Sequence, residues 1–431
     1  MAELTRPLTR LNATAMVAGT IIGASIFVQP SELARHLETP GAIIGVWLAC
    51  GVLTLFGALV CAELASFFPQ TGGVYVFLRD TFSPLAGFLW GWAMFWSVHS
   101  GIIAAIAVVC ARYVAVLVPM GDTGIRIAAV AVIVLLSALN YVGVKAGSGT
   151  QTAFTIAKIA GIALIVAIGF TFAVPAATKV AATSASTDPA SAREFLLATV
   201  AGLFAYGGWH MVTYTAGETR MPARTIPFAL LTGVAIVTVS YVALNLAYLR
   251  ILPVETVRSS TQVAADAANV LMGRGGSTVM AALVIMSSIG ALTGIVLTGP
   301  RVYYSMARDG LAPRWLDAVH PVFRTPARAI VVQGIWSAVL AATGAYRQLF
   351  TRVIYTEWLF FGLMAVGLFV LRRRPGYAPP YRTWGFPVVP IVFILSAVTI
   401  VANQFASTPA EAAAGLGFVA LGVPAYYLRR R

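Results

Sequence analysis

The stretch Gly19-Thr-Ile-Ile-Gly-Ala-Ser-Ile-Phe27 places small residues in the middle of the first long apolar run of the chain. A second cluster, Phe204-Ala-Tyr-Gly-Gly-Trp209, interrupts the sixth such run. Glycine in a helix interior costs about 1 kcal/mol relative to alanine, so these two positions are where a helix can unwind. The alternative is that the small residues only allow close helix packing.

The runs around these clusters are too apolar for a water-soluble domain. Of the 431 residues, 59% are hydrophobic and 10% are charged, whereas soluble domains carry about 25% charged residues. A membrane span takes roughly 20 apolar residues, and about twelve such runs are present. Stretches such as 127–139 and 391–401 are apolar on every side, which favours helices in lipid over the alternating strands of a barrel. The sequence therefore predicts an all-α polytopic membrane protein.

The predicted spans leave only short connections, so we expect one integrated domain over residues 1–431. The longest polar stretches, 175–193, 251–276 and 305–328, could hold short helices but no separate domain. We expect the spans near residues 11–35, 40–68, 83–113, 125–143, 149–174, 195–216, 226–250, 277–304, 329–343, 350–371, 387–404 and 411–428.

The two interrupted runs occupy equivalent positions if residues 11–174 and 195–371 form two repeats of five spans each. An odd number of spans makes such repeats inverted in the membrane. A matched pair of glycine-interrupted helices is then the best sequence pointer to the binding site of a secondary transporter. The last two spans, within 387–428, would be peripheral.

The net charge of +14 comes from 29 Lys and Arg against 15 Asp and Glu. Most of the basic residues lie in short loops on one side, if the N-terminus is cytoplasmic. This bias fits the positive-inside rule with both termini cytoplasmic, and the lipid bilayer rather than nucleic acid is the expected partner. The excess of Arg over Lys and the many Ala are typical of a GC-rich prokaryotic source, which would make the membrane a bacterial inner, or plasma, membrane. The first apolar run begins near Leu11 and has spanning length, so no cleaved signal peptide is expected.

Lys158 is the most informative charged residue. It lies nine residues after Gly149, where we expect the fifth span to begin, hence about 13–14 Å deep at the rise of an α-helix. A lysine near the bilayer centre costs at least about 2.5–3.5 kcal/mol. We therefore expect a paired or functional ammonium there rather than a bystander.

Further motifs complete the pattern. They are Ile21 to Pro30, Phe204 to Trp209 with Glu218-Thr-Arg-Met-Pro222 after it, Ala307-Arg-Asp-Gly310, and Ala62-Glu-Leu64 with Gly72-Gly-Val-Tyr75. Together they resemble the amino acid–polyamine–organocation superfamily, and most of all its L-type amino acid transporter branch. The resemblance runs from the first span to the basic end of the tenth. It implies a LeuT-like fold of ten core helices plus two peripheral ones, which moves its substrate by alternating access. The family usually has Gly-Ser-Gly where this chain has Gly23-Ala24-Ser25, which would narrow the pocket.

The implied substrate, an α-amino acid, is a zwitterion, so its site must offer donors to a carboxylate and acceptors to an ammonium. Free N–H groups of Gly23, Ala24 and Ser25, at the start of a half-helix, suit the carboxylate. Freed carbonyls suit the ammonium, and we expect them at Ile21, Ile22, Phe204, Ala205 and Gly207, with Tyr206 in the same turn.

The resemblance also gives Lys158 a role. A lysine at this position occupies the place where sodium-coupled relatives hold a sodium ion, next to first-span carbonyls near Gly19 and to eighth-span hydroxyls, for which Ser287 and Ser288 are candidates. A fixed ammonium there implies sodium-independent transport. Whether Lys158 also gains and loses a proton, which would separate exchange from proton symport, stays open.

Several other side chains have two possible roles. Phe204 is a gate over the substrate or plain packing, and Trp358 lines the pocket or belongs to the interfacial belt. Glu357 selects a cationic side chain, takes up a proton or simply faces water. Glu63 and Glu218 are expected to form gating ion pairs with loop arginines.

Other function classes have little support. The four histidines lack metal-ligand spacing, so we expect no metal and no cofactor. We expect His99 and His210 to be hydrogen-bonded packing residues, with a proton relay as the alternative. We also expect a packing role for Cys50, Cys61 and Cys110. An integral-membrane enzyme or a channel is a distant alternative. We expect a sodium-independent exchanger of small or mid-sized neutral L-amino acids. Proton-coupled uptake and antiport of cationic amino acids or polyamines are the alternatives. A homo-oligomer is possible, and nothing indicates an accessory subunit.

Overall fold

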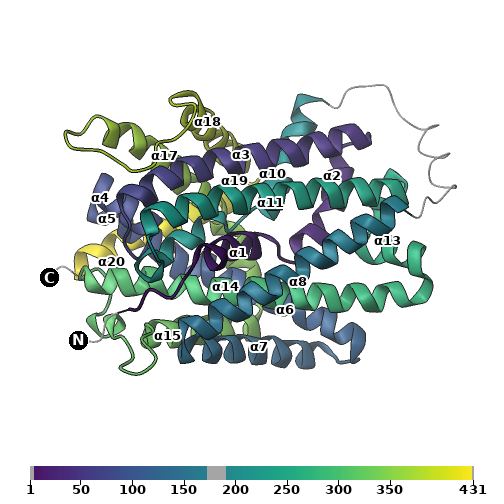
Figure 1. Ribbon diagram of the computed structural model, residues 1–431, viewed down its shortest axis with the longest axis horizontal. Coiled ribbons are helices and arrows are strands. Elements are labelled where there is room, and N and C mark those ends of the chain that lie inside the picture. The colour runs from purple at the N-terminus through teal and green to yellow at the C-terminus, as the bar shows by residue number, and fades with distance from the viewer. Residues whose placement is uncertain (1–3, 172–190, 430–431) are drawn as a thin grey trace.

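The computed structural model describes residues 4–171 and 191–429, and their regular secondary structure is helical. The expected loop at 175–193 and the end of the 149–174 span lie largely outside the described residues. Figure 1 shows a bundle of long helices running roughly parallel or antiparallel to one another, with α1 in its middle and both chain termini at one end. We call this the terminal end, and the opposite end, where α2 and α13 lie, the far end.

Within the described residues, ten helical segments are long and apolar enough to cross a membrane. They are α3 (Pro40–Phe67), α5 to α6 (Pro84–Leu117), α7 (Asp122–Val142), α8 (Val144–Thr171), α10 to η3 (Ala192–Glu218), α11 (Pro222–Ile251), α14 (Gly276–Arg308), α17 (Tyr355–Arg372), α18 (Val388–Ser407) and α19 to α20 (Pro409–Arg429). The shorter apolar helix α15 (Ala327–Thr343) and the interrupted first span complete the predicted set. The predicted class, an all-α polytopic membrane protein, is confirmed.

Several boundaries differ from the expected ones, among them the following three. α8 begins at Val144 rather than near residue 149, because Gly143 ends α7 with an extended backbone and the polar residues that follow continue as the first helical turns. α14 continues to Arg308, beyond the expected residue 304. The run expected at 350–371 is divided into α16 (Tyr346–Val353) and α17.

Short helices fill the connections between the spans. They are α4 (Val74–Thr81), α12 (Val254–Ser259), α13 (Val263–Met272), η4 (Gly273–Gly275) and η5 (Arg314–Asp317). A π-helical turn, η2 (Met94–Val98), joins α5 (Pro84–Ala93) to α6 (His99–Leu117). α19 ends at Ala420 and α20 begins at Gly422. The polar stretches 251–276 and 305–328 therefore hold short helices, as predicted.

The first span is interrupted where its glycines predict. α1 (Arg10–Ile21) starts with a capping box between Thr9 and Asn12 and ends at Ile21. The Gly23 N–H then donates to the Ile21 carbonyl at 2.8 Å, instead of to Gly19 as an α-helix requires. The chain resumes as η1 (Ser25–Phe27) and α2 (Gln29–His36). This break therefore leaves backbone groups inside the membrane that need other partners.

The sixth span is interrupted in the same way. α10 (Ala192–Ala205) ends at a turn, and η3 (Trp209–Glu218) follows. Gly208 has a φ of +98°, a left-handed conformation that side chains other than glycine rarely adopt. Thr20 in the first span donates from Oγ1 to the Gly208 carbonyl at 3.2 Å. The two interruptions therefore face each other in the centre of the bundle.

α1 packs against α8, α11 and α14, so the first break is enclosed by three long helices. α18 packs against α17 and α3 at the edge of the bundle, where Figure 1 shows it. The division into inverted repeats at 11–174 and 195–371 stays a prediction.

We predict that Gly208→Ala destabilises the protein. A Cβ there would lie 3.2 Å from the Thr20 carbonyl oxygen, and the left-handed backbone adds strain of roughly 1–2 kcal/mol for a side chain. The measurement is the unfolding temperature of purified protein in detergent, which should fall by several degrees. The control is Gly417→Ala in α19, where a Cβ meets no atom within 4 Å. Equal unfolding temperatures for the two variants would contradict the prediction.

Candidate functional site

A cavity of about 300 Å³ lies between the two interruptions. Its wall combines residues of both breaks with residues of α3, α6, α14 and α17. Eight predicted substrate residues line it: Ile21, Gly23, Ala24, Ser25, Phe204, Tyr206, Gly207 and Trp358. The other two, Ile22 and Ala205, do not line it. The two interruptions therefore enclose a hollow in the middle of the bundle.

The N–H groups at the first break are only partly available. Gly23 donates within its own turn to Ile21. The N–H groups of Ala24 and Ser25, and of Ile26 after them, donate to no acceptor within residues 4–171 and 191–429. Ala24 and Ser25 line the cavity. They are the backbone donors of this break best placed to bind an anion.

The carbonyls freed by the breaks are more engaged than the sequence suggests. The Tyr241 hydroxyl of α11 lies 3.1 Å from the carbonyl oxygens of both Ile21 and Ala205, one in each break. The Phe204 carbonyl accepts from Gly207 N–H at 3.3 Å. The Ile22 carbonyl faces Lys158 instead of the cavity. Ile21, Ile22 and Ala205 thus contact the protein's own donors, and the Gly207 region remains the part of the second break that lines the cavity.

Lys158 is buried in the middle of α8 and binds the first break directly. Its Nζ atom donates to the carbonyls of Gly19 at 2.9 Å, Ile22 at 2.5 Å and Ser287 at 3.3 Å. Gly19 is the residue whose carbonyl lost its helical partner when Gly23 turned away. The ammonium therefore replaces the missing backbone donor, as a bound cation would.

The predicted role of the two serine hydroxyls is only partly right. Lys158 contacts the carbonyl of Ser287, while the Ser287 hydroxyl lies 3.3 Å from the Ile22 carbonyl and 3.2 Å from that of Gly23. The Ser288 hydroxyl is buried without a hydrogen-bond partner among the described residues, so it does not hold Lys158. Hydroxyls at consecutive helix positions point in directions about 100° apart, and one of them reaches the break.

The far-end wall of the cavity is mostly apolar. Phe204, half exposed, lies at its edge, and Trp358 is packed beside Phe361 and Phe393. The apolar lining includes Val28, Ile102, Ile106, Val109, Ile295 and Phe361. Glu357 is the one acidic residue of this lining and is 7% exposed. The interpretation that Glu357 simply faces water is therefore wrong, because α17 presents it to the cavity.

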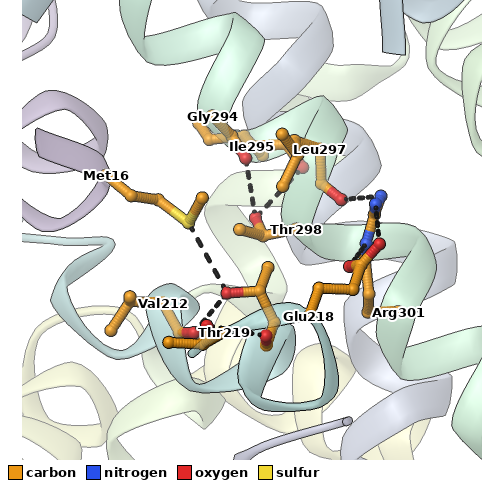
Figure 2. Close-up of polar contacts among 10 residues, drawn as sticks. Met16, Val212, Glu218, Thr219, Gly294, Ile295, Leu297, Thr298 and Arg301 are labelled. Carbon is orange, nitrogen blue, oxygen red and sulfur yellow. Dashed lines mark hydrogen bonds and ion pairs between the residues drawn. The ribbon is translucent and has the colours of Figure 1, made fainter. Parts of the chain in front are cut away.

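The terminal end is closed by a buried ion pair between η3 and α14. Figure 2 shows the Glu218 carboxylate facing the Arg301 guanidinium, with Nε–Oε2 and Nη2–Oε1 distances of 2.7 and 3.0 Å. Arg301 also donates to the Leu297 carbonyl one turn earlier. The predicted partner was a loop arginine, but Arg301 lies inside α14 with no exposed side-chain surface. The expected span 277–304 already contained residue 301, and the packing of α14 against η3 buries its side chain.

Two more charged clusters lie at the same end. The Glu63 carboxylate accepts from Arg372 at 2.6 and 3.0 Å, and from the Thr383 N–H at 2.7 Å. Asp309 accepts from Tyr75 at 2.7 Å and pairs with Arg79. Glu63 thus pairs with an arginine, as predicted, although Arg372 is the last residue of α17 rather than a loop residue. Ion pairs therefore join several spans at the terminal end.

The histidines differ from each other. His99 Nδ1 lies 3.3 Å from the Tyr303 hydroxyl, as expected for a hydrogen-bonded packing residue. His210 is fully buried, and neither of its ring nitrogens has a hydrogen-bond partner among the described residues. Hydrogen-bonded packing is therefore wrong for His210. The three cysteines are buried, in agreement with a packing role.

The sequence reasoning missed Tyr241. Its position within a long apolar run could have indicated this role, because a tyrosine hydroxyl buried in the membrane needs a hydrogen-bond partner within the protein. Gln151 and Thr155 were missed for the same reason, and both donate to the Ala15 carbonyl of α1.

Two interrupted helices around a central cavity, closed at one end by ion pairs, define an alternating-access membrane transporter. The amino acid permease family model matches residues 8–422, so the chain belongs to that family. Its members are transporters and not enzymes.

Named relatives span nearly the whole chain. The human cystine/glutamate transporter is 29% identical over 99% of this chain and 85% of its own length. The mouse b(0,+)-type amino acid transporter 1 is 30% identical over 93% of this chain and 82% of its own length. The serine/threonine exchanger SteT of Bacillus subtilis is 30% identical over 97% of this chain and 95% of its own length.

We predict that Arg301→Gln is strongly destabilising, because it leaves the Glu218 carboxylate buried without a counter-charge, at a cost of about 3–5 kcal/mol. The double variant with Glu218→Gln should recover part of the loss, as unfolding temperatures in detergent would show. Arg35→Gln, which removes an exposed ion pair with Glu32, is the control and should change stability by less than about 1 kcal/mol. A harmless Arg301→Gln would show that this pair does not hold the terminal end closed.

Proposed function

We propose that this chain exchanges L-amino acids across the membrane by alternating access, without sodium. The observation that carries the proposal is the Lys158 ammonium, which is bound to the Gly19 and Ile22 carbonyls of the first break, next to the cavity. A protein cation that is already in place leaves no need for a bound metal cation at this position. The family resemblance implies that Lys158 occupies the place where sodium-coupled relatives bind a sodium ion.

The cavity suits a zwitterion at one wall and an apolar side chain at the other. The N–H groups of Ala24 and Ser25 would bind the substrate carboxylate, and backbone oxygen of the Gly207 turn would accept from its ammonium. Phe204 and Trp358 would close over the side chain. The Ala24 methyl group and the volume of about 300 Å³ favour small or mid-sized amino acids.

Alternating access would use the ion pairs of the terminal end as the inner gate. The described conformation has Glu218–Arg301 and Glu63–Arg372 formed. Separation of these pairs, with closure of the far end over Phe204, would move the substrate across. By the positive-inside rule, the terminal end would lie in the cytoplasm. The Arg- and Ala-rich composition favours the bacterial inner membrane.

Exchange rather than net uptake is favoured by the relatives, one of which is named as a serine/threonine exchanger. Because the ammonium stays in the protein, no coupled ion moves with the substrate and no ion gradient drives net uptake. The carrier would therefore return to the first side with a second amino acid bound. Proton-coupled uptake is the alternative. The liposome experiment described next distinguishes exchange from proton-coupled uptake.

The test is uptake of labelled L-serine and L-alanine into liposomes containing the purified protein, in sodium-free buffer. We expect uptake only when the liposomes are loaded with an amino acid, with no response to added sodium. Uptake into empty liposomes that follows a pH gradient would replace exchange by proton symport. Strict sodium dependence would contradict the role of Lys158.

We predict that Lys158→Ala lowers this exchange at least about tenfold, because the Gly19 and Ile22 carbonyls lose about 1.4 kcal/mol or more of stabilisation in the transporting conformations. Lys145→Ala, on the exposed first turn of the same helix, is the matched control and should exchange like the wild type. Membrane insertion of both variants is checked by their yield after extraction. Full exchange by Lys158→Ala would make this lysine a bystander.

A further inference from the structure

A carboxyl group in the wall of the cavity lies next to a buried imidazole, and the two groups share no hydrogen bond. His210 Nε2 lies 3.4 Å from Glu357 Oε1, and neither atom has a hydrogen-bond partner among the described residues. Both side chains are more than nine-tenths buried. The two groups come from η3 and α17, the elements that enclose the cavity beside the second break.

The surroundings provide no counter-charge for this pair. The titratable side chains around it contact one another in sequence: Tyr214 of η3 contacts His210, His99 of α6 contacts Tyr214, and Tyr303 of α14 contacts His99. Cys61 of α3 interacts with Tyr214. Trp90, Phe360 and Phe361 cover its remaining sides. None of the described residues that line the cavity is a lysine or an arginine.

This environment determines how many protons the pair holds. An isolated carboxylate or an isolated imidazolium is very costly in an apolar wall. A neutral carboxylic acid beside a neutral imidazole, or a carboxylate beside an imidazolium, has no net charge, and each arrangement holds one proton between the two groups. Loss of that proton leaves a single negative charge, which is stable only next to a new cation.

A substrate with a cationic side chain brings such a cation. We propose that Glu357 is the residue that admits cationic amino acids, and that the ammonium or guanidinium of their side chain displaces the one proton shared by Glu357 and His210. This inference rests on the proposed exchange function and adds a substrate class to it.

The charges balance in this step. The substrate side chain brings one positive charge and donates hydrogen bonds to the Glu357 carboxylate, and one proton leaves the pair for the water of the cavity. A neutral substrate leaves the proton in place. Exchange of an external cationic amino acid for an internal neutral one therefore moves one proton outwards and is electroneutral.

The direction of the pH effect follows from this competition. Low pH keeps the proton on the pair and excludes the cationic side chain, and high pH favours the cationic substrate. We therefore expect the ratio of L-lysine uptake to L-alanine uptake, in liposomes loaded with L-alanine, to rise about tenfold from about pH 6 to about pH 8.

A pH-sensitive dye outside the liposomes should also report acidification when L-lysine enters, and none when L-alanine enters. In Glu357→Gln the lysine-to-alanine ratio should fall about tenfold at about pH 8 and no longer change with pH. Glu32→Gln is the matched control, because it removes an acidic side chain on α2, outside the cavity lining, and should keep the wild-type ratio and its pH dependence.

The outcomes separate the two proposals. No exchange of any amino acid would contradict the proposed function itself. Alanine exchange without lysine uptake at either pH would overturn the Glu357 proposal and leave the exchange function standing. Lysine uptake without proton release, or an unchanged ratio in Glu357→Gln, would also overturn it. The dye measurement on the wild type keeps the proposal testable even if Glu357→Gln does not fold.

Discussion

The bond between the Lys158 ammonium and the first break is the interaction on which this architecture depends. Lipid offers no hydrogen bonds, so a helix that opens inside a membrane must find partners for its backbone within the protein. The carbonyls of Gly19 and Ile22 find one in Lys158, and the lysine in turn finds acceptors for a charge that the bilayer would otherwise exclude. The break in the first span and the buried charge of Lys158 therefore stabilise each other.

Hydrogen bonds from neutral hydroxyl groups connect the second break to the first. The Tyr241 hydroxyl reaches the carbonyls of Ile21 and Ala205, and Thr20 reaches the carbonyl of Gly208. These bonds link the two spans at the level of the cavity. The ion pairs Glu218–Arg301 and Glu63–Arg372, by contrast, lie at the terminal end. The centre of the bundle is thus held by hydrogen bonds to backbone carbonyls, and the terminal end by ion pairs.

Much of this could be predicted from the sequence, because glycine clusters and a lysine in apolar runs are local signals. The positions of both breaks belong to this part, whereas the partner of Lys158 near Gly19 was implied by the family resemblance. The burial of Arg301, the orientation of Glu357 and the unpaired nitrogens of His210 could not be predicted, because each depends on which helix packs against which. The sequence also could not predict that Lys158 contacts the Ser287 carbonyl while the Ser287 hydroxyl contacts the Gly23 carbonyl, because this depends on the direction of the side chain.

The most direct test of the account is an experimental structure of the purified protein with a neutral L-amino acid bound. The account predicts the substrate carboxylate at the N–H groups of Ala24 and Ser25, its ammonium at the turn around Gly207, and Lys158 still bound to Gly19 and Ile22. A substrate found away from both interruptions, or a continuous α-helix through Gly23 and Gly207, would contradict it.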